Sequence, residues 1–349
     1  MRIGIYDPYL DTLGGGERYI FSIARSLVKN NEIDIFWNEN LKQEAEKKFG
    51  FSLSGINFEK NIFSKEFGFI DRILKTLRYD IIFFVSDGSI PVLLSKKNFL
   101  VVQYPLKSFN KGLINRIKFL KISGTICYSN FIKRYLDKML PGEVFVLNPT
   151  TSSIKVKKGK ENIILNVGRF TKGTNNKKQD FLIEFFKRLY NQGAKDWKLI
   201  LCGSVLDADI EFVKNLRSKK GKYPIEIIIS PTFDDLANFY SRAKIYWHAT
   251  GLGEDIGLYP EKAEHFGIST VEAMSAGCVP VVINAGGQKE IVEDGKNGFL
   301  WDNPDELIKL TMKIINDKDL FEKISRNAIN RAKFFTEDRF DRQLQENIK

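Results

Sequence analysis

The sequence predicts an α/β protein built from two Rossmann-like domains, each a doubly wound parallel sheet with helices on its faces. A strand-like apolar run, a polar or Gly-rich turn and an amphipathic helix begin at residue 2, and the same pattern begins again near residue 162. In both halves, short apolar runs then alternate with helix-like segments, which is typical of βαβ units. The length of 349 residues fits two domains of about 150 residues each.

The first half starts with the apolar run RIGIY, a Gly-rich turn and a predicted helix at 17–30. Later runs in this half are rich in β-branched and aromatic residues, so we expect further buried strands. These runs lie at 32–38, 79–86, 98–104, 124–129 and 142–148.

The second half starts with a predicted strand at 162–170, followed by a polar loop and a helix at 179–193 with apolar residues at helical spacing. Further strands are expected at 198–204, 225–230, 243–249 and 278–285.

A polar, basic stretch at 154–162 lacks apolar periodicity and is predicted to be the interdomain linker. We therefore expect an N-terminal domain over 1–155 and a C-terminal domain over 156–325. A long charged helix is predicted at roughly 318–345, and the segment 326–349 could pack back on the first domain.

Composition narrows the class of protein. Lys and Arg number 54 against 43 Asp and Glu, a net charge of +11, so an anionic partner is expected: nucleic acid, an anionic membrane or a phosphate-bearing substrate. Three scattered cysteines and two histidines predict neither a disulfide framework nor a metal site, and no cofactor is expected. Apolar runs are too short to span a membrane, and no leader pattern is evident, so a cytoplasmic protein is expected.

The most informative stretch is 259–300, where Glu264 and Glu272 stand eight positions apart on either side of a His-Phe-Gly turn. Ser269 is the predicted N-cap of a helix that ends at Gly277. Amides near Gly267 and Ile268 would then lie at a positive helix terminus, which favours an anion. Two carboxylates for hydroxyl groups and an amide cluster for phosphate together indicate a nucleotide-sugar site.

Glu272 also has a purely structural interpretation. Ser269 followed by Glu272 matches a capping box, in which the glutamate satisfies the helix terminus. The two interpretations do not exclude each other.

These residues resemble the E-x7-E signature of glycosyltransferase family 4, retaining enzymes of GT-B architecture, in which two Rossmann-like domains face each other across a cleft. The resemblance extends to the Gly-Gly-x-Glu loop from Gly14 to Glu17, the Val-Gly-Arg segment ending at Arg169, and the GG-x-x-E and NGF elements near 286–299. The GGGER loop and the motif around Glu264 are most similar to members that act in lipid-linked or surface glycan assembly.

The resemblance implies a role for each matching residue. Glu264 would bind hydroxyls of the transferred sugar, and Glu272 the ribose hydroxyls. Arg169 and a lysine would hold the diphosphate; Lys177 is the counterpart if the loop carries an insertion, and Lys172 is the competing choice. The implied catalytic residues are thus Glu264, Arg169 and Lys177, and the implied donor-binding residues are Glu272, Gly267, Ile268, Gly14, Gly15, Gly16 and Gln103.

Gln103 marks a departure from the family pattern, because many relatives carry a histidine at the corresponding strand end. A glutamine can donate a hydrogen bond to a sugar or phosphate but carries no charge. Structural roles are favoured for His248, His265 and Asp87, and the Asp-x-Asp pattern at 207–211 is interpreted as a helix start.

The resulting hypothesis is metal-independent, retaining transfer of a hexosyl unit from GDP- or UDP-hexose to an acceptor hydroxyl on a lipid-linked or surface glycan. The alternatives are a glycosyltransferase with a soluble acceptor, a nucleotide-sugar epimerase of the same fold, and a non-enzymatic nucleic-acid-binding protein; the preferred hypothesis includes no nucleic-acid partner. Residues 107–138 carry eight Lys or Arg and one Asp interleaved with apolar residues. This pattern suggests an anionic membrane surface as partner, with peripheral attachment to the inner face of the cell membrane. An ordinary solvated helix face remains the alternative.

Overall fold

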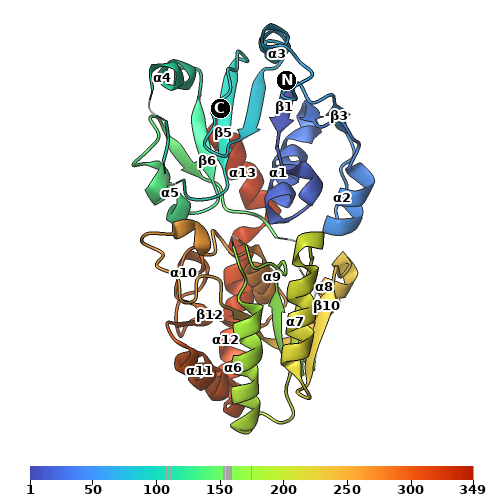
Figure 1. The fold of residues 1–349 in the computed structure, drawn as a ribbon, viewed down its shortest axis with the longest axis vertical. Helices are drawn as coiled ribbons and strands as arrows, with labels where there is room; N and C mark the ends of the chain where they lie inside the picture. Colours follow the sequence, from blue (N-terminus) through green and yellow to red (C-terminus); the bar gives the residue numbers. More distant parts are fainter. Residues whose placement is uncertain (107, 111, 152–153, 155–158, 174, 349) are drawn as a thin grey trace. The chain divides into compact units, whose positions relative to one another are not determined.

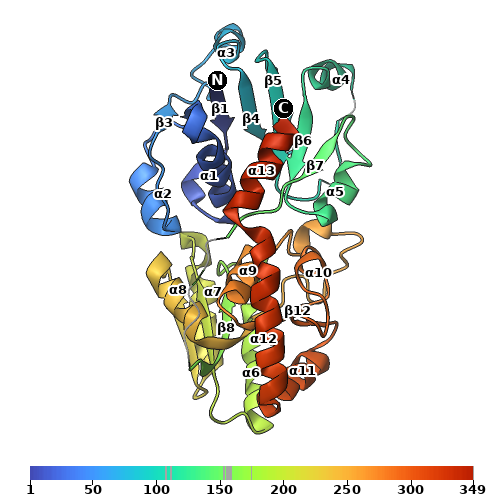
Figure 2. The same cartoon turned by 180° about the vertical axis from the view of Figure 1, so that it is seen from behind.

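The computed structural model describes residues 1–106, 108–110, 112–151, 154, 159–173 and 175–348. The chain divides into two compact units (Figures 1 and 2). Unit 1 comprises Met1–Thr150 together with Glu337–Lys349, and unit 2 comprises Thr151–Thr336. None of the described helices is both long and apolar enough to cross a membrane.

Unit 1 contains a seven-stranded sheet in the order β3-β2-β1-β4-β5-β6-β7, with neighbouring strands parallel. All five residues of β4 are buried, as expected for a parallel strand covered on both faces. The strands are β1 (Arg2–Tyr6), β2 (Glu32–Phe36), β3 (Ile56–Glu59), β4 (Ile81–Val85), β5 (Lys97–Val102), β6 (Gly124–Cys127) and β7 (Val144–Val146). The helices are α1 (Gly15–Leu27), α2 (Lys42–Phe49), α3 (Phe69–Thr76), α4 (Leu113–Phe119), α5 (Asn130–Leu136) and α13 (Glu337–Ile348).

Unit 2 contains a six-stranded parallel sheet in the order β10-β9-β8-β11-β12-β13. Helices cover both of its faces: α6 and α7 lie in front in Figure 1, and α12 lies in front in Figure 2. The strands are β8 (Glu161–Val167), β9 (Lys198–Gly203), β10 (Ile225–Ile229), β11 (Ala243–His248), β12 (Val279–Ile283) and β13 (Phe299–Trp301). The helices are α6 (Gln179–Asn191), α7 (Ile210–Lys220), α8 (Phe233–Arg242), α9 (Ile268–Ser275), α10 (Gln288–Ile291), α11 (Pro304–Asn316) and α12 (Lys318–Ala332).

Both sheets have a point where the strand order reverses, between β1 and β4 in unit 1 and between β8 and β11 in unit 2. In doubly wound sheets, ligands bind at the carboxyl ends of the strands on either side of such a point. The predicted α/β class with two doubly wound parallel sheets is therefore confirmed, and the two strand-order reversals indicate where to look for a site.

The structure differs from the sequence-based element assignment in several places. The short strands β3 and β13 were not predicted, because three or four residues carry too little periodicity to identify a strand. The predicted helix at 318–345 is instead two helices, separated by a 3-10 turn at Lys333–Phe335 and by Thr336 in extended conformation. The Phe335 carbonyl accepts a hydrogen bond from the Thr151 amide rather than continuing the helix.

The boundary between the units falls at residues 150/151, where the sequence suggested 155/156. Of the expected linker at 154–162, residues 155–158 lie outside the described part of the chain, and β8 already begins at Glu161. The segment that belongs to unit 1 is α13, a shorter piece than 326–349. Three of the contacts that hold α13 there are the rings of Tyr19 and Phe340, 5.7 Å apart, the Arg25–Glu337 ion pair at 2.9 Å, and the hydrogen bond from the Lys97 ammonium to the Ile348 carbonyl (3.0 Å).

Candidate functional site

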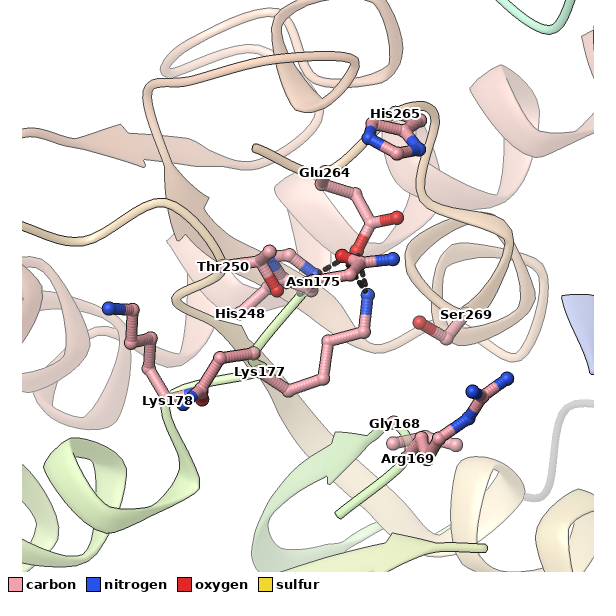
Figure 3. A network of polar contacts seen from close by, with 12 residues as sticks. Gly168, Arg169, Asn175, Lys177, Lys178, His248, Thr250, Glu264, His265 and Ser269 are labelled. Atoms are coloured by element: carbon pink, nitrogen blue, oxygen red, sulfur yellow. Dashed lines mark hydrogen bonds and ion pairs between the residues drawn. The ribbon is translucent and has the colours of Figure 1, made fainter. Parts of the chain in front are cut away.

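The site in unit 2 is built at the carboxyl ends of β8 and β11. Gly168 and Arg169 directly follow β8, and His248 is the last residue of β11. The two strand ends are tied together by a hydrogen bond from the Asn166 amide group to the Trp247 carbonyl (2.9 Å). The loop that precedes α9 brings Glu264 to the same edge, as Figure 3 shows.

Glu264 is the centre of a polar network that draws on three separate segments. Its Oε2 accepts a hydrogen bond from the Lys177 ammonium (2.7 Å) and lies 2.7 Å from Nε2 of His248. Lys177 also donates to the side chain of Asn175 (3.0 Å). In Figure 3 the Lys177 and His248 side chains converge on Glu264, whereas Lys178 points away. The Oε1 atom of Glu264 has no hydrogen-bond partner among the described residues.

The electrostatics of the network follow from burial and from these contacts. Only 12% of the Glu264 side chain is exposed. Burial alone would raise its pKa, but Lys177 and the hydrogen bond from His248 outweigh this and hold the pKa well below its usual range. Burial lowers the pKa of His248, against the opposing effect of Glu264. The network at neutral pH is therefore a carboxylate, an ammonium and a neutral imidazole that donates from Nε2.

Two glycines hold the backbone of Glu264 in place. The Gly287 amide donates to the Glu264 carbonyl (2.7 Å). A Cβ on Gly286 would lie 2.2 Å from that same carbonyl oxygen, and one on Gly287 would lie 2.5 Å from the Cα of Phe266. The Gly-Gly element thus allows the loop at 284–287 to pack directly on the segment that carries Glu264.

Arg169 and Lys177 supply the positive charge of the site. Arg169 is half-buried, and within the described residues its guanidinium has neither a hydrogen bond nor an ion pair. The Lys177 stem lies across Gly168, where an added Cβ would approach its Cγ to 2.7 Å. Lys172, the competing lysine, is exposed and its ammonium lies 5.7 Å from the Phe212 ring centre. The structure therefore brings Lys177, and not Lys172, against Glu264.

The start of α9 differs from the prediction. The N-cap is Gly267, in the left-handed region at φ 119°, so the helix begins at Ile268 and Ser269 is not its cap. The first intrahelical bond is donated by Thr270 to the Gly267 carbonyl (3.0 Å). The amides of Ile268 and Ser269 come before Thr270 in the chain and therefore have no acceptor within the helix. They are the helix-terminal amides that were expected near Gly267 and Ile268.

Glu272 does not form the predicted capping box with Ser269. The Glu272 side chain is buried and accepts a hydrogen bond from the Tyr240 hydroxyl (2.9 Å). Ser269 instead accepts a hydrogen bond from the Tyr246 hydroxyl (2.7 Å). Burial, followed by the charge of Glu272, raises the pKa of Tyr240 well above its ordinary value, so this tyrosine stays a hydrogen-bond donor.

In unit 1, the predicted glycines and Gln103 lie together at the carboxyl edge of the first sheet. Gly14 is the N-cap of α1, and Gly15 is its first residue. The Gln103 amide donates to the Gly16 carbonyl (3.3 Å), and a Cβ on Gly16 would lie 2.5 Å from Oε1 of Gln103. A larger residue at position 16 would therefore displace the end of the Gln103 side chain.

Sequence reasoning assigned structural roles to three residues that now have definite positions. His248 is buried at the end of β11, as expected of a structural strand-end histidine, and its Nε2 lies 2.7 Å from Oε2 of Glu264, a contact that the sequence did not indicate. His265 lies within hydrogen-bonding distance of the Glu261 carbonyl, and Asp87 is exposed in the loop after β4. Among the described residues, no group of three or more His, Cys, Asp or Glu could hold a metal ion.

The two doubly wound parallel sheets, one in each unit, have the architecture of the GT-B class of α/β proteins. Residues 148–331 match the model of the family described as glycosyl transferases group 1, and the chain belongs to this family. Among solved structures, Anabaena HepE in complex with UDP and glucose is 19% identical with a TM-score of 0.73 and covers 100% of this chain and 99% of its own. A glycosyltransferase from Rickettsia africae is 17% identical with a TM-score of 0.75, and the match covers 100% of this chain and 98% of the Rickettsia chain. At these identities the likeness shows the fold alone.

Curated relatives include an uncharacterized glycosyltransferase of Methanocaldococcus jannaschii, 28% identical over 60% of this chain and 55% of the relative. The GDP-Man:Man(3)GlcNAc(2)-PP-Dol alpha-1,2-mannosyltransferase of Dictyostelium discoideum is 26% identical over 66% of this chain and 47% of the relative. The chain thus spans about half the length of these two relatives. The alpha-1,3/1,6-mannosyltransferase ALG2 of the same organism is 26% identical, with 95% of this chain and 94% of the relative covered.

Proposed function

We propose that the protein is a retaining hexosyltransferase that moves a sugar from GDP- or UDP-hexose to an acceptor hydroxyl on a lipid-linked or surface glycan. The observation that carries this proposal is the convergence of Lys177 and the buried carboxylate of Glu264 beside Arg169 at one sheet edge. The name of the Dictyostelium mannosyltransferase, which includes GDP-Man and a PP-Dol acceptor, supports a lipid-linked acceptor. The HepE complex with UDP and glucose supports a nucleotide-sugar donor.

Each residue has a definite part in binding the donor. Oε1 of Glu264 accepts hydrogen bonds from hydroxyls of the transferred hexose, because Oε2 is already held by Lys177 and His248. An ammonium has three donors, and Lys177 uses two of them, on Glu264 and Asn175, which leaves one for the diphosphate. The guanidinium of Arg169 binds the diphosphate as well.

Further donor contacts follow from the resemblance to the family. The amides of Gly267 and Ile268 receive a phosphate oxygen, and Glu272 receives the ribose hydroxyls. For Gly14, Gly15, Gly16 and Gln103 in unit 1, the resemblance implies donor contacts as well.

The chemical step needs stabilisation of a departing diphosphate. As the bond from the anomeric carbon to the phosphate oxygen breaks, negative charge grows on that oxygen, and Arg169, Lys177 and the helix-terminal amides stabilise it without a metal. The acceptor oxygen forms the new bond on the same face of the sugar. Its proton passes to the departing phosphate oxygen, so no carboxylate nucleophile is needed and the anomeric configuration is retained.

The test is a set of single substitutions assayed for sugar transfer. We expect Arg169→Ala, Lys177→Ala and Glu264→Gln each to lower kcat/KM by about 100-fold or more, the usual cost of losing a transition-state contact. Lys172→Ala is the matched control for Lys177→Ala and should stay within about twofold, since it removes a cation of the same loop that lies away from Glu264. Wild-type rates for Arg169→Ala and Glu264→Gln would overturn the assignment.

Donor and reaction type are separated by two further measurements. Thermal shifts with GDP- and UDP-hexoses identify the nucleotide, because a ligand that binds the folded state raises its stability by mass action. Product analysis without acceptor distinguishes transfer from epimerisation, since an epimerase would convert the donor alone. NMR of the product's anomeric proton shows whether configuration is retained.

The same proposal places unit 1 on the inner face of the cell membrane through residues 107–138, of which 107 and 111 lie outside the described part. Two short helices expose large apolar side chains, which we call the α3–α4 face. Its members, 54–83% exposed, are Phe69, Ile70, Leu74, Leu77, Leu113, Ile114, Ile117 and Leu120. Basic residues interleave with them on both helices, a combination that suits anionic lipid better than nucleic acid.

Both helices pack on the loop that joins β4 to β5, which keeps the α3–α4 face together. The Leu94 amide donates to the hydroxyl of Thr76 in α3 (3.1 Å), and Lys118 in α4 donates to the Ile90 carbonyl (2.9 Å). Figures 1 and 2 both show α3 and α4 at the end of unit 1 where β1 starts.

A further inference from the structure

An apolar groove lies between the end of α4 and the turn that follows α5, with a volume of ≈ 580 Å³. Phe109, Phe119, Leu120 and Met139 contribute to its lining. The rings of Phe109 and Phe119 meet edge to face with centres 5.3 Å apart, so one wall is a fixed aromatic pair. Leu120 is 83% exposed and belongs both to the groove and to the α3–α4 face.

The charged residues of the groove are both cations. Arg116 and Lys138 line it, and neither side chain has a hydrogen bond or ion pair with a described residue. None of the described lining residues is acidic. The neighbouring Asp137 is engaged by Lys133 at 3.3 Å. An anionic group at the groove would therefore meet two available cations.

The two uncharged polar side chains in the described lining each make a hydrogen bond to the segment at 110–112 or from it. The Asn115 amide donates to the Asn110 carbonyl (2.9 Å), and the Asn110 side chain accepts from the Gly112 amide (2.8 Å). A peptide in the groove would find few partners for its backbone groups, and unpaired buried backbone groups are costly. A hydrocarbon chain makes no such demand and gains from burial of its methylenes.

We propose that this groove binds the hydrocarbon chain of a phosphorylated lipid, with its phosphate held by Arg116 and Lys138, and that this lipid carries the acceptor glycan. The inference rests on the proposed glycosyl transfer and specifies its acceptor. Continuity with the α3–α4 face supports it, because Leu113, Ile114 and Ile117 on the same helix lead from a bilayer to the groove.

The position of the groove sets a minimum size for the acceptor. Ile122 and Gly142, which line it, precede the first residues of β6 and β7, whereas Gln103 follows the last residue of β5. A strand rises about 3.3 Å per residue, so the six residues of β5 separate the two edges by about 20 Å. With the accepting hydroxyl at the carboxyl edge beside Gln103, as the proposed function has it, several sugars must join it to the lipid phosphate, which favours an oligosaccharide carrier over a lipid monosaccharide.

The test measures binding of farnesyl phosphate, farnesol and inorganic phosphate to the full-length protein by calorimetry below the micellar range. We expect farnesyl phosphate to bind at least tenfold more tightly than either of the others. Arg116→Gln combined with Lys138→Gln should raise the Kd of farnesyl phosphate at least tenfold and leave that of farnesol unchanged. Met139→Trp, which fills the groove, should weaken both lipids, and its thermal midpoint reports whether it folds.

A matched control lies on the outward side of the same helix. Ile114→Glu should abolish flotation with anionic liposomes but keep the Kd of farnesyl phosphate within about twofold. An unchanged Kd in both the double glutamine variant and Met139→Trp would overturn the groove assignment. Because this readout needs no catalysis, absence of sugar transfer would overturn the proposed function without affecting the binding result, and transfer without groove binding would do the reverse.

Discussion

Asp7 is a buried carboxyl group at the carboxyl end of β1 whose ionisation should destabilise unit 1. It is 1% exposed, and its Oδ1 accepts a hydrogen bond from the Tyr9 amide (2.9 Å), while Oδ2 has no partner among the described residues. Burial and then repulsion from Glu17, with a smaller contribution from Asp11, raise the pKa of Asp7 to about 7. We predict that Asp7→Asn stabilises unit 1 at pH 8.

The sign and size follow from proton linkage. The unfolded carboxyl loses its proton near 3.8, whereas the folded one keeps it until about 7. The folded state thus binds more protons between these values, so stability falls as pH rises from about 4 to about 7 and is then constant. About three pK units at ~1.36 kcal/mol each give a penalty of about 4 kcal/mol. The asparagine amide would lack an acceptor at the Oδ2 position, which costs about 1–3 kcal/mol, so the expected net gain is about 1–3 kcal/mol.

The assay must report on unit 1 alone, since a two-unit chain need not unfold in one step. Cys127 is buried in unit 1, and Cys202 and Cys278 are buried in unit 2. Thiol labelling across a urea series, resolved by mass spectrometry, therefore gives a separate midpoint for each unit. The Cys127 midpoint of the variant should lie above that of wild type at pH 8 and below it near pH 4, while the other two midpoints stay unchanged. Equal slopes of the Cys127 midpoint against pH in both proteins would refute the reasoning.

Three further outcomes are expected. His248→Ala removes one of two hydrogen-bond donors on Glu264 and should lower kcat/KM about tenfold, the lower end of the loss expected for a positioning group; an unchanged transfer rate would assign the histidine to packing alone. Gly287→Ala places a Cβ in backbone contact and should destabilise unit 2 by about 1–3 kcal/mol in thermal unfolding, whereas Gly173→Ala, with only a 3.5 Å contact, serves as the neutral control. Ile117→Glu should weaken flotation with anionic liposomes at low salt, and undiminished flotation would exclude α4 from membrane contact.

Regular elements were predictable wherever their burial is continuous along the chain. The strand β4, with five apolar residues, and the Gly-rich start of α1 can be predicted from the sequence, because the structure of each depends on residues within a few positions. The break before α13 was missed although its signal is local: Thr336 is followed directly by the two acidic residues Glu337 and Asp338 in the first turn.

The sequence suggested which residues form the candidate site, but not which of them contact one another. Glu264 and Glu272 were proposed from their spacing, yet the hydrogen bond that Glu272 accepts from Tyr240 comes from 32 positions away and from another helix. The preference for Lys177 over Lys172 rested on the resemblance alone, because the contact depends on how the chain passes Gly168 and meets Glu264. Such contacts are set by the packing of distant segments, which spacing along one chain does not encode.

The return of α13 to unit 1 has a consequence for synthesis on the ribosome. Residues 1–150 emerge first, but the helix that covers Tyr19 and pairs with Arg25 is made only after all of unit 2. Until then, that side of α1 remains uncovered, and nascent chains with exposed apolar surface are targets for chaperones and aggregation. Unit 1 can reach its final stability only after α13 has been synthesised, so the unit that is synthesised first is completed after unit 2 has been made.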